Sequence, residues 1–140
     1  MTFRLTIGDW RQQSAGARAV RIEVFVREQA IPLELEWDEM DAASLHAVAW
    51  DASGQAIGTG RLLPDGHIGR MAVSKEQRGR GIGGSILRRL MECARQRGDP
   101  AVLLHAQSQV EPFYLRFGFA RCGEEFIEAG ILHVPMRHRF

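Results

Sequence analysis

The segment from Gln77 to Gly84 constrains the fold most, because half of its eight residues are glycine and it joins two apolar stretches. The stretch before it, His67–Val73, is typical of a strand, and the stretch after it has helical apolar spacing as far as about Arg97. Glycines let several backbone N–H groups turn toward one point, and a helix N-terminus adds partial positive charge. We therefore expect a strand–loop–helix unit that cradles a phosphate. A glycine-rich turn without a ligand is the weaker interpretation, because two arginines lie inside the segment.

Alternation, helical spacing and turn residues predict the other elements of a mixed α/β (α+β) domain. With 140 residues, the chain has the size of one domain, residues 1–140. We expect about seven strands and three or four helices. The expected strands cover residues 2–7, 45–51, 55–63, 67–73, 101–106, 119–128 and 131–138, and the expected helices cover 10–27, the run that ends near 97, 112–117 and a short stretch after Pro32.

Composition excludes several classes of protein. Eighteen basic and seventeen acidic side chains give a net charge of +1, which offers no global reason to expect a nucleic-acid partner. No segment is apolar over the length needed to cross a bilayer, so we expect no membrane association. The two cysteines have no metal-binding or redox spacing, and no metal site is expected. A reduced, cytoplasmic location follows from this cysteine usage.

Charge is unevenly distributed along the chain. Residues 28–41 contain six acids and no base, whereas residues 75–97 contain seven bases and two acids. Two solvated faces would explain this pattern, and so would one pocket for a cationic ligand and another for an anionic ligand. Of the eighteen bases only Lys75 is a lysine, so few amines of this chain could themselves be modified.

Two ligand classes fit the glycine segment. The spacing Gly79-x-Gly81-x-x-Gly84 spells the dinucleotide fingerprint of nicotinamide-dependent oxidoreductases. That fingerprint requires an acid at the end of the next strand, whereas the strand 101–106 runs into His105-Ala106-Gln107. The oxidoreductase therefore stays the weaker alternative.

The second spacing, Arg78-x-x-Gly81-x-Gly83, resembles the pyrophosphate-binding motif of the GNAT acetyltransferases. The stretch Ile68–Val73 is similar to the central strand of that family, and Phe113-Tyr114-x-x-x-Phe117-Gly118-Phe119 is similar to its F-Y-x-x-x-G-F signature. These elements occur in the family's order and cover most of the chain.

Three further patterns resemble the small ElaA/YjcF-type branch of the family. They are Arg27-Glu28-Gln29, the spacing Glu36-x-Asp38-x-x-Asp41-x-x-x-x-His46, and the tail Glu128-x-Gly130-Ile131-x-His133.

The resemblance implies a GNAT acyl-CoA N-acyltransferase fold that binds acetyl-CoA. Strands 67–73 and 101–106 would splay apart, and the pantetheine arm would fill the gap. Tyr114, the only tyrosine, would act as the general acid that protonates the departing thiolate. The residues expected to bind the cofactor are Met71, Ala72, Val73, Arg78, Gly79, Arg80, Gly81, Ile82, Gly83, Gly84, Gln107, Phe113, Tyr114 and Phe117.

The family's acceptor is a primary amine, which would receive the acetyl group directly in a ternary complex. We expect acidic and imidazole side chains to bind it, namely Glu28, Glu36, Asp38, His105 and His133. The general base stays unassigned among these residues, Asp41 and His46, and it could act through water. The identity of the amine, whether a small molecule or a peptide, and the oligomeric state stay open, although homodimers are common in the family. A non-catalytic acyl-CoA-binding module is the other alternative.

Overall fold

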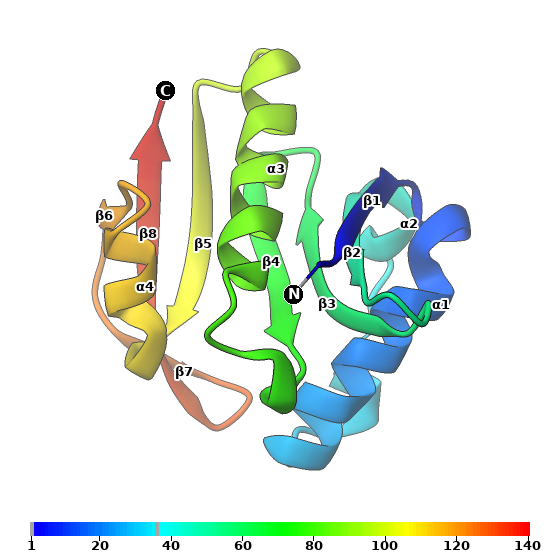
Figure 1. The fold of residues 1–140 in the computed structure, drawn as a ribbon. Helices are drawn as coiled ribbons and strands as arrows, with labels where there is room; N and C mark the ends of the chain where they lie inside the picture. The colour runs from blue at the N-terminus through cyan, green and yellow to red at the C-terminus, as the bar shows by residue number, and fades with distance from the viewer. Residues whose placement is uncertain (1, 36) are drawn as a thin grey trace.

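The computed structural model describes residues 2–35 and 37–140. The described residues form one mixed sheet of eight strands in the order β1-β2-β3-β4-β5-β8-β6, with β7 paired to β8 (Figure 1). Its strands are β1 Arg4–Gly8, β2 Leu45–Trp50, β3 Ala56–Leu62, β4 His67–Val73, β5 Ala101–Gln107, β6 Ala120–Arg121, β7 Phe126–Glu128 and β8 Ile131–Arg139. Its α-helices are α1 Trp10–Arg21, α2 Met40–Ala43, α3 Ile82–Gln96 and α4 Glu111–Leu115.

The predicted fold, a mixed sheet of about seven strands with three or four helices, is confirmed, with two differences in detail. The expected strand 119–128 is divided into β6 and β7. Their common partner β8 carries Pro135 between the residues that pair with the two strands, and proline has no N–H to give to a ladder. The expected helix 10–27 ends as an α-helix at Arg21 and continues as a wider π-helical segment, Ile22–Glu28.

Helices α1 and α3 cover opposite faces of the sheet, as the contacts around two glycines show. A Cβ on Gly16 of α1 would lie 2.8 Å from Val48, whereas a Cβ on Gly58 of β3 would lie 2.9 Å from Ile86 of α3 and 3.5 Å from Ala49. Val48 and Ala49 are neighbours in β2, so they point to opposite faces. The close packing of α1 and α3 on the two faces of the sheet thus depends on glycines, which have no side chain.

The buried core lies mainly between the sheet and α3. Its members include Ile82, Ile86, Leu87 and Leu90 of α3, whose spacing places them on one stripe of the helix. Helix α3 lies in front of the sheet in Figure 1 and contacts both β4 and β5. Among the described residues, no helix has the length and apolarity that a bilayer crossing requires.

Strands β4 and β5 run parallel but pair only at one end. The register joins His67 to Leu103 and Ile68 to Leu104, and the strands then diverge toward their C-terminal ends (Figure 1). Divergence begins where β4 bulges: its register with β3 shifts between Thr59 and Arg61, and Arg70 has a φ of 51°. A bulge bends its strand and increases its twist. The expected splay between residues 67–73 and 101–106 therefore has a local cause in the bulge at Arg70.

Candidate active site

The glycine segment forms an open cradle at the N-terminus of α3. Gly79 and Gly81 have φ values of 80° and 81°, which favour glycine, and a Cβ at either position would meet nothing within 4 Å. Gly81 is the N-cap and provides no side chain to the helix. The N–H groups of the first helical turn have no acceptor within the helix, so they face the cradle with partial positive charge. These features fit an anionic group such as a pyrophosphate.

Arg78 stands at the cradle but already holds a carboxylate. Its Nη1 and Nη2 donate to Glu28 at 2.8 and 2.6 Å, and its Nε donates to the carbonyl of Val73 at 3.0 Å. These hydrogen bonds lower the pKa of Glu28 and raise that of Arg78. Arg78, which we expect to bind the pyrophosphate, and Glu28, which we expect to bind the amine, are therefore hydrogen-bonded to each other in this structure.

Phe113 and Phe117 form the wall of the cradle on the side of α4. A Cβ on Gly83 would lie 3.6 Å from Phe113, and one on Gly84 would lie 2.8 Å from Phe117. The Arg88 guanidinium lies 5.0 Å from the centre of the Phe117 ring. Both aromatic rings are thus placed against the first turn of α3.

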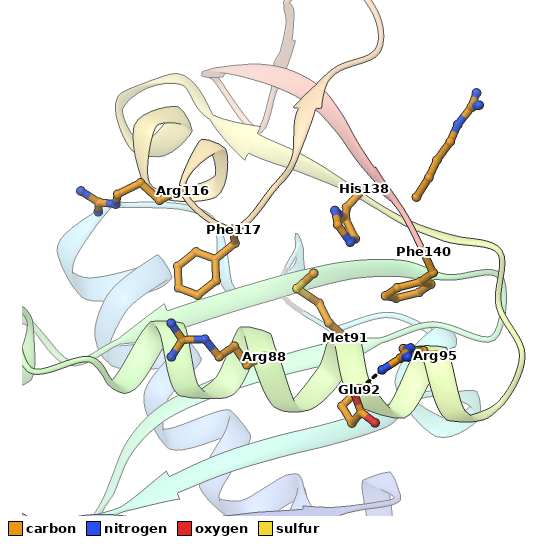
Figure 2. Close-up of a pocket in the computed structure, with 9 residues that line it drawn as sticks. Arg88, Met91, Glu92, Arg95, Arg116, Phe117, His138 and Phe140 are labelled. Carbon is orange, nitrogen blue, oxygen red and sulfur yellow. Dashed lines mark ion pairs between the residues drawn. The ribbon is translucent and has the colours of Figure 1, made fainter.

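Beyond Phe117, a cavity of about 690 Å³ follows α3 away from the cradle (Figure 2). Four arginines, a glutamate and three aromatic rings give it a positive, partly aromatic lining. The lining residues are Arg88, Met91, Glu92, Arg95, Arg116, Phe117, His138, Arg139 and Phe140. Of the expected site residues, only Phe117 belongs to it, so this cavity is separate from the gap between β4 and β5.

Tyr114 is buried near the end of β5, with its ring 5.1 Å from Phe113 and 5.9 Å from Phe119. Its hydroxyl makes no hydrogen bond with the residues that the structure describes. Burial raises the pKa of Tyr114 to about 12, so the phenol stays protonated at neutral pH. A protonated phenol can donate a hydrogen bond, whereas complete loss of its proton is unfavourable.

Gln107, which we expect to contact the cofactor, connects β5 to Gln29 at the end of the π-helical segment. Gln29 Nε2 donates to Gln107 Oε1 at 3.2 Å, and Gln107 Nε2 donates to Gln29 Oε1 at 2.9 Å. Gln109 Nε2 adds a third bond, to Gln107 Oε1 at 2.8 Å. The Gln29–Gln107 amide pair therefore joins two segments that are far apart in sequence, at the end of β5 that has left β4.

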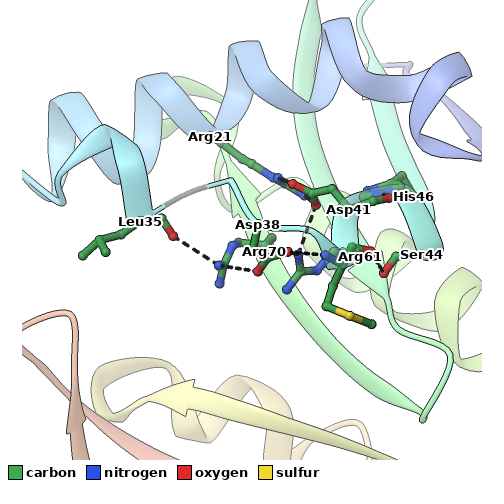
Figure 3. Close-up of polar contacts among 9 residues, drawn as sticks. Arg21, Leu35, Asp38, Asp41, Ser44, His46, Arg61 and Arg70 are labelled. Atoms are coloured by element: carbon green, nitrogen blue, oxygen red, sulfur yellow. Dashed lines mark hydrogen bonds and ion pairs between the residues drawn. The ribbon is translucent and has the colours of Figure 1, made fainter.

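Two acids of the acidic stretch, Asp38 and Asp41, are paired with arginines (Figure 3). Asp38 accepts from Arg61 at 2.7 Å and from Arg70 at 3.2 Å. Buried Asp41 accepts from Arg21 and Arg61 at 3.0 Å each. Burial would raise the pKa of Asp41, but the hydrogen bonds and charges of both arginines outweigh it and lower that pKa. Asp38 and Asp41 are thus held in ion pairs with arginines, and Glu36 lies outside the described residues.

His46 is excluded as a base that touches substrate. Its side chain is fully buried, its Nε2 donates to the Asp41 carbonyl at 2.8 Å, and its ring lies 4.8 Å from that of Trp10. Burial lowers the pKa of His46, which keeps the ring neutral inside the layer between β2 and α1.

His105 and His133 come together with three residues that the sequence analysis did not select. Glu128 lies 3.5 Å from His105 Nδ1 and 3.8 Å from His133 Nε2. Phe126 is stacked on His133 at 5.8 Å, and His67 is 5.8 Å from His105. Positions 126 and 128 share one face of a strand, which is the signal that could have placed both beside His133.

Comparison with known proteins agrees with this geometry. Residues 10–140 match the family model described as an acetyltransferase (GNAT) domain. The chain is 40% identical over 138 residues to the uncharacterized N-acetyltransferase YjcF of Bacillus subtilis, covering 96% of this chain and 98% of that protein. An acyl-CoA N-acyltransferase from Pseudomonas aeruginosa superposes with a TM-score of 0.85 at 30% identity, covering 98% of this chain and 99% of that one. Escherichia coli ElaA superposes with a TM-score of 0.86 at 26% identity, covering 99% of this chain and all of that one. The chain belongs to the GNAT acetyltransferase family.

Proposed function

We propose that this protein transfers the acetyl group of acetyl-CoA directly to the nitrogen of a primary amine, in a ternary complex. The observation that carries the proposal is the divergence of β4 and β5 beside the N-terminus of α3, where no side chain caps the helix. One cofactor could reach both ends of the gap between these strands, with its phosphates on the cradle and its thioester near the phenol of Tyr114.

The residues at the gap would have the following roles in binding acetyl-CoA. The amides of Gly81 to Gly84, with Arg78 and Arg80, would bind the pyrophosphate by charge-assisted hydrogen bonds. The edge of β4 at Met71, Ala72 and Val73 lies beyond the residues that pair with β5, so it would bind the amides of the pantetheine arm. Gln107 would contact the same arm from β5.

Tyr114 would act as the proton donor to sulfur. A thiol has an ordinary pKa near 8.5. Complete transfer of a proton to a thiolate from a phenol of pKa about 12 is therefore unfavourable. A hydrogen bond from the buried hydroxyl nevertheless stabilises negative charge on the leaving group where water is excluded.

The test combines CoA binding and turnover. Calorimetry with CoA and with NAD⁺ distinguishes a CoA-binding protein from an oxidoreductase, and thiol release from acetyl-CoA is then followed with a panel of alkylamines, diamines, amino sugars and peptide N-termini. Binding of CoA together with turnover of at least one amine is the expected result. CoA binding without turnover of any amine would instead favour the non-catalytic module.

A further inference from the structure

The face of the sheet opposite α3 carries a cluster of titratable side chains on β4, β5, β7 and β8. Leu104 and Ala106 of β5 are buried in the core against α3. His105 lies between them in sequence and therefore points to the other face, where its side chain is 43% exposed. Helix α1 covers that face over β1 to β4. The cluster thus lies beside α1, on the half of the face that belongs to β5 and β8.

Within this cluster Glu128 faces the His105 ring, with Oε1 3.5 Å from Nδ1. A carboxylate can only accept hydrogen bonds, so it favours the tautomer in which Nδ1 carries the proton. Nε2 of His105 then has a free lone pair. In many enzymes a carboxylate orients the imidazole of a general base in this way and holds it in one tautomer.

Glu128 also faces His133 on β8. His133 Nε2 lies 3.8 Å from its other oxygen, and His133 Nδ1 donates to the Ile131 carbonyl at 2.7 Å, which fixes that ring. The turn after Glu128 consists of Ala129 and Gly130, with φ values of 52° and 75°, the signs of a tight hairpin turn. The carboxylate therefore belongs to an ordered hairpin.

The ring of His105 is also held by aromatic neighbours. Phe126 lies 4.9 Å from it at 82°, and His67 lies 5.8 Å from it at 75°. The charged groups around this ring are Glu128 on β7, His133 on β8, Asp65 beside His67, and Arg137, which shares the face of β8 with His133.

His105 is the first residue of β5 beyond its pairing with β4, so it stands where the gap opens. Tyr114 belongs to the core on the face of α3. The imidazole and the phenol therefore lie on opposite faces of the sheet, at the end of β5 that has left β4. An acceptor that enters from the exposed face would meet His105 before the gap.

We propose that His105 is the general base that deprotonates the acceptor amine and that Glu128 is the residue that positions it. This inference rests on the proposed acetyl transfer. The ammonium group gives one proton to His105 Nε2, and the nitrogen lone pair forms the C–N bond as the C–S bond breaks. Sulfur receives a proton from Tyr114 as the second proton lost by nitrogen passes to the phenol, so the hydroxyl is not left ionised. The proton on His105 passes to solvent, so the products are an amide, a thiol and one proton.

An imidazole suits this step better than the carboxylates nearby. An alkylammonium has an ordinary pKa near 10.4, an imidazole near 6.5 and a glutamate near 4.3, so transfer to imidazole is the smaller step by about two pKa units. A well-placed base of this kind typically contributes about 10²–10⁴-fold to the rate.

The experiment uses the full chain, and its first part needs no acceptor. Long-range ¹⁵N NMR of the histidine rings should show His105 with its proton on Nδ1, and Glu128→Gln should change that tautomer population. The exposed Glu124→Gln is the matched control and should leave it unchanged. A His105 ring that carries its proton on Nε2 in the wild type overturns the proposal.

The second part measures kinetics with whichever amine of the panel the wild type acetylates. His105→Gln should lower kcat by about 10²-fold or more and remove the ascending limb of the pH profile of kcat/KM, with an unchanged Kd for CoA. Glu128→Gln should lower kcat less, and His138→Gln, whose ring bonds the Gly118 carbonyl, should have no effect. Full kcat in His105→Gln refutes this inference alone, whereas failure of the wild type to bind CoA or to acetylate any amine refutes the proposed function and this inference with it.

Discussion

Glu28 occupies both terminal nitrogens of Arg78, at 2.6 and 2.8 Å. The pair joins the end of the π-helical segment to the cradle before α3, across fifty positions of sequence. A guanidinium in this state cannot offer both terminal nitrogens to a second anion in the same plane. The carboxylate and an incoming pyrophosphate therefore compete for Arg78.

Glu28→Gln should tighten the binding of CoA by a few-fold, because it removes the competing charge and leaves the side chain's shape. The pair is partly exposed, which limits the effect to about 1 kcal/mol or less. Calorimetry with CoA checks this, with Glu124→Gln as the control. Weaker binding in Glu28→Gln would show instead that Glu28 holds Arg78 in its binding position.

Tyr114→Phe should lower kcat by about 10²-fold while the Kd for acetyl-CoA changes less than two-fold, because the ring's packing remains and only the hydroxyl is lost. Steady-state kinetics and calorimetry on the same preparation measure the two quantities. Unchanged kcat at saturating amine would remove Tyr114 from the chemistry, and an equal loss of affinity would indicate a role in binding.

The strand–loop–helix unit was predictable because its signals are local. The bounds of β4 agree with prediction, and α3 ends within one residue of its expected end, since apolar spacing and glycine act within a few positions. The break between β6 and β7 was not predictable in this way, because it arises opposite Pro135 on a strand that follows them.

The sequence could predict which residues belong to the candidate site, but it could not predict most of the contacts between them. The motif placed Tyr114 near Phe113 and Phe117, which are its neighbours in sequence. It could not show that Glu28 bonds Arg78 or that Asp41 bonds Arg21, because these partners are fifty and twenty positions apart and no periodicity relates them. The abundance of arginine acquires a partial physical explanation here, since both contacts are bidentate and require a planar guanidinium.

Asp41→Asn should destabilise the fold by about 3–5 kcal/mol at pH 7, because it removes the buried carboxylate that pairs with the fully buried Arg21. The pKa of Asp41 is lowered in the folded chain, so its contribution is complete above the ordinary value of 3.8 and is lost as pH falls through the lower folded pKa. Urea unfolding at pH 7 and pH 5 should therefore give the same difference between variant and wild type. The surface variant Glu124→Gln should stay within about 0.5 kcal/mol of wild type.

Two adjacent glycines of the cradle, Gly83 and Gly84, should respond differently to alanine. A Cβ on Gly83 would lie 3.6 Å from both Phe113 and Val73, which is an ordinary contact. Because alanine favours a helix over glycine by about 1 kcal/mol, Gly83→Ala should raise the free energy of unfolding by up to that amount. A Cβ on Gly84 would lie 2.8 Å from Phe117, so the ring must move.

Displacement of that ring costs about 1–3 kcal/mol, which offsets or exceeds the helical gain, so Gly84→Ala should not stabilise the protein. It should also weaken the contact of Phe117 with Arg88. Urea unfolding of the two variants side by side measures the difference, and each serves as the other's control for helix propensity. Equal stabilisation by both substitutions would mean that Phe117 moves freely and does not form a fixed wall of the cradle.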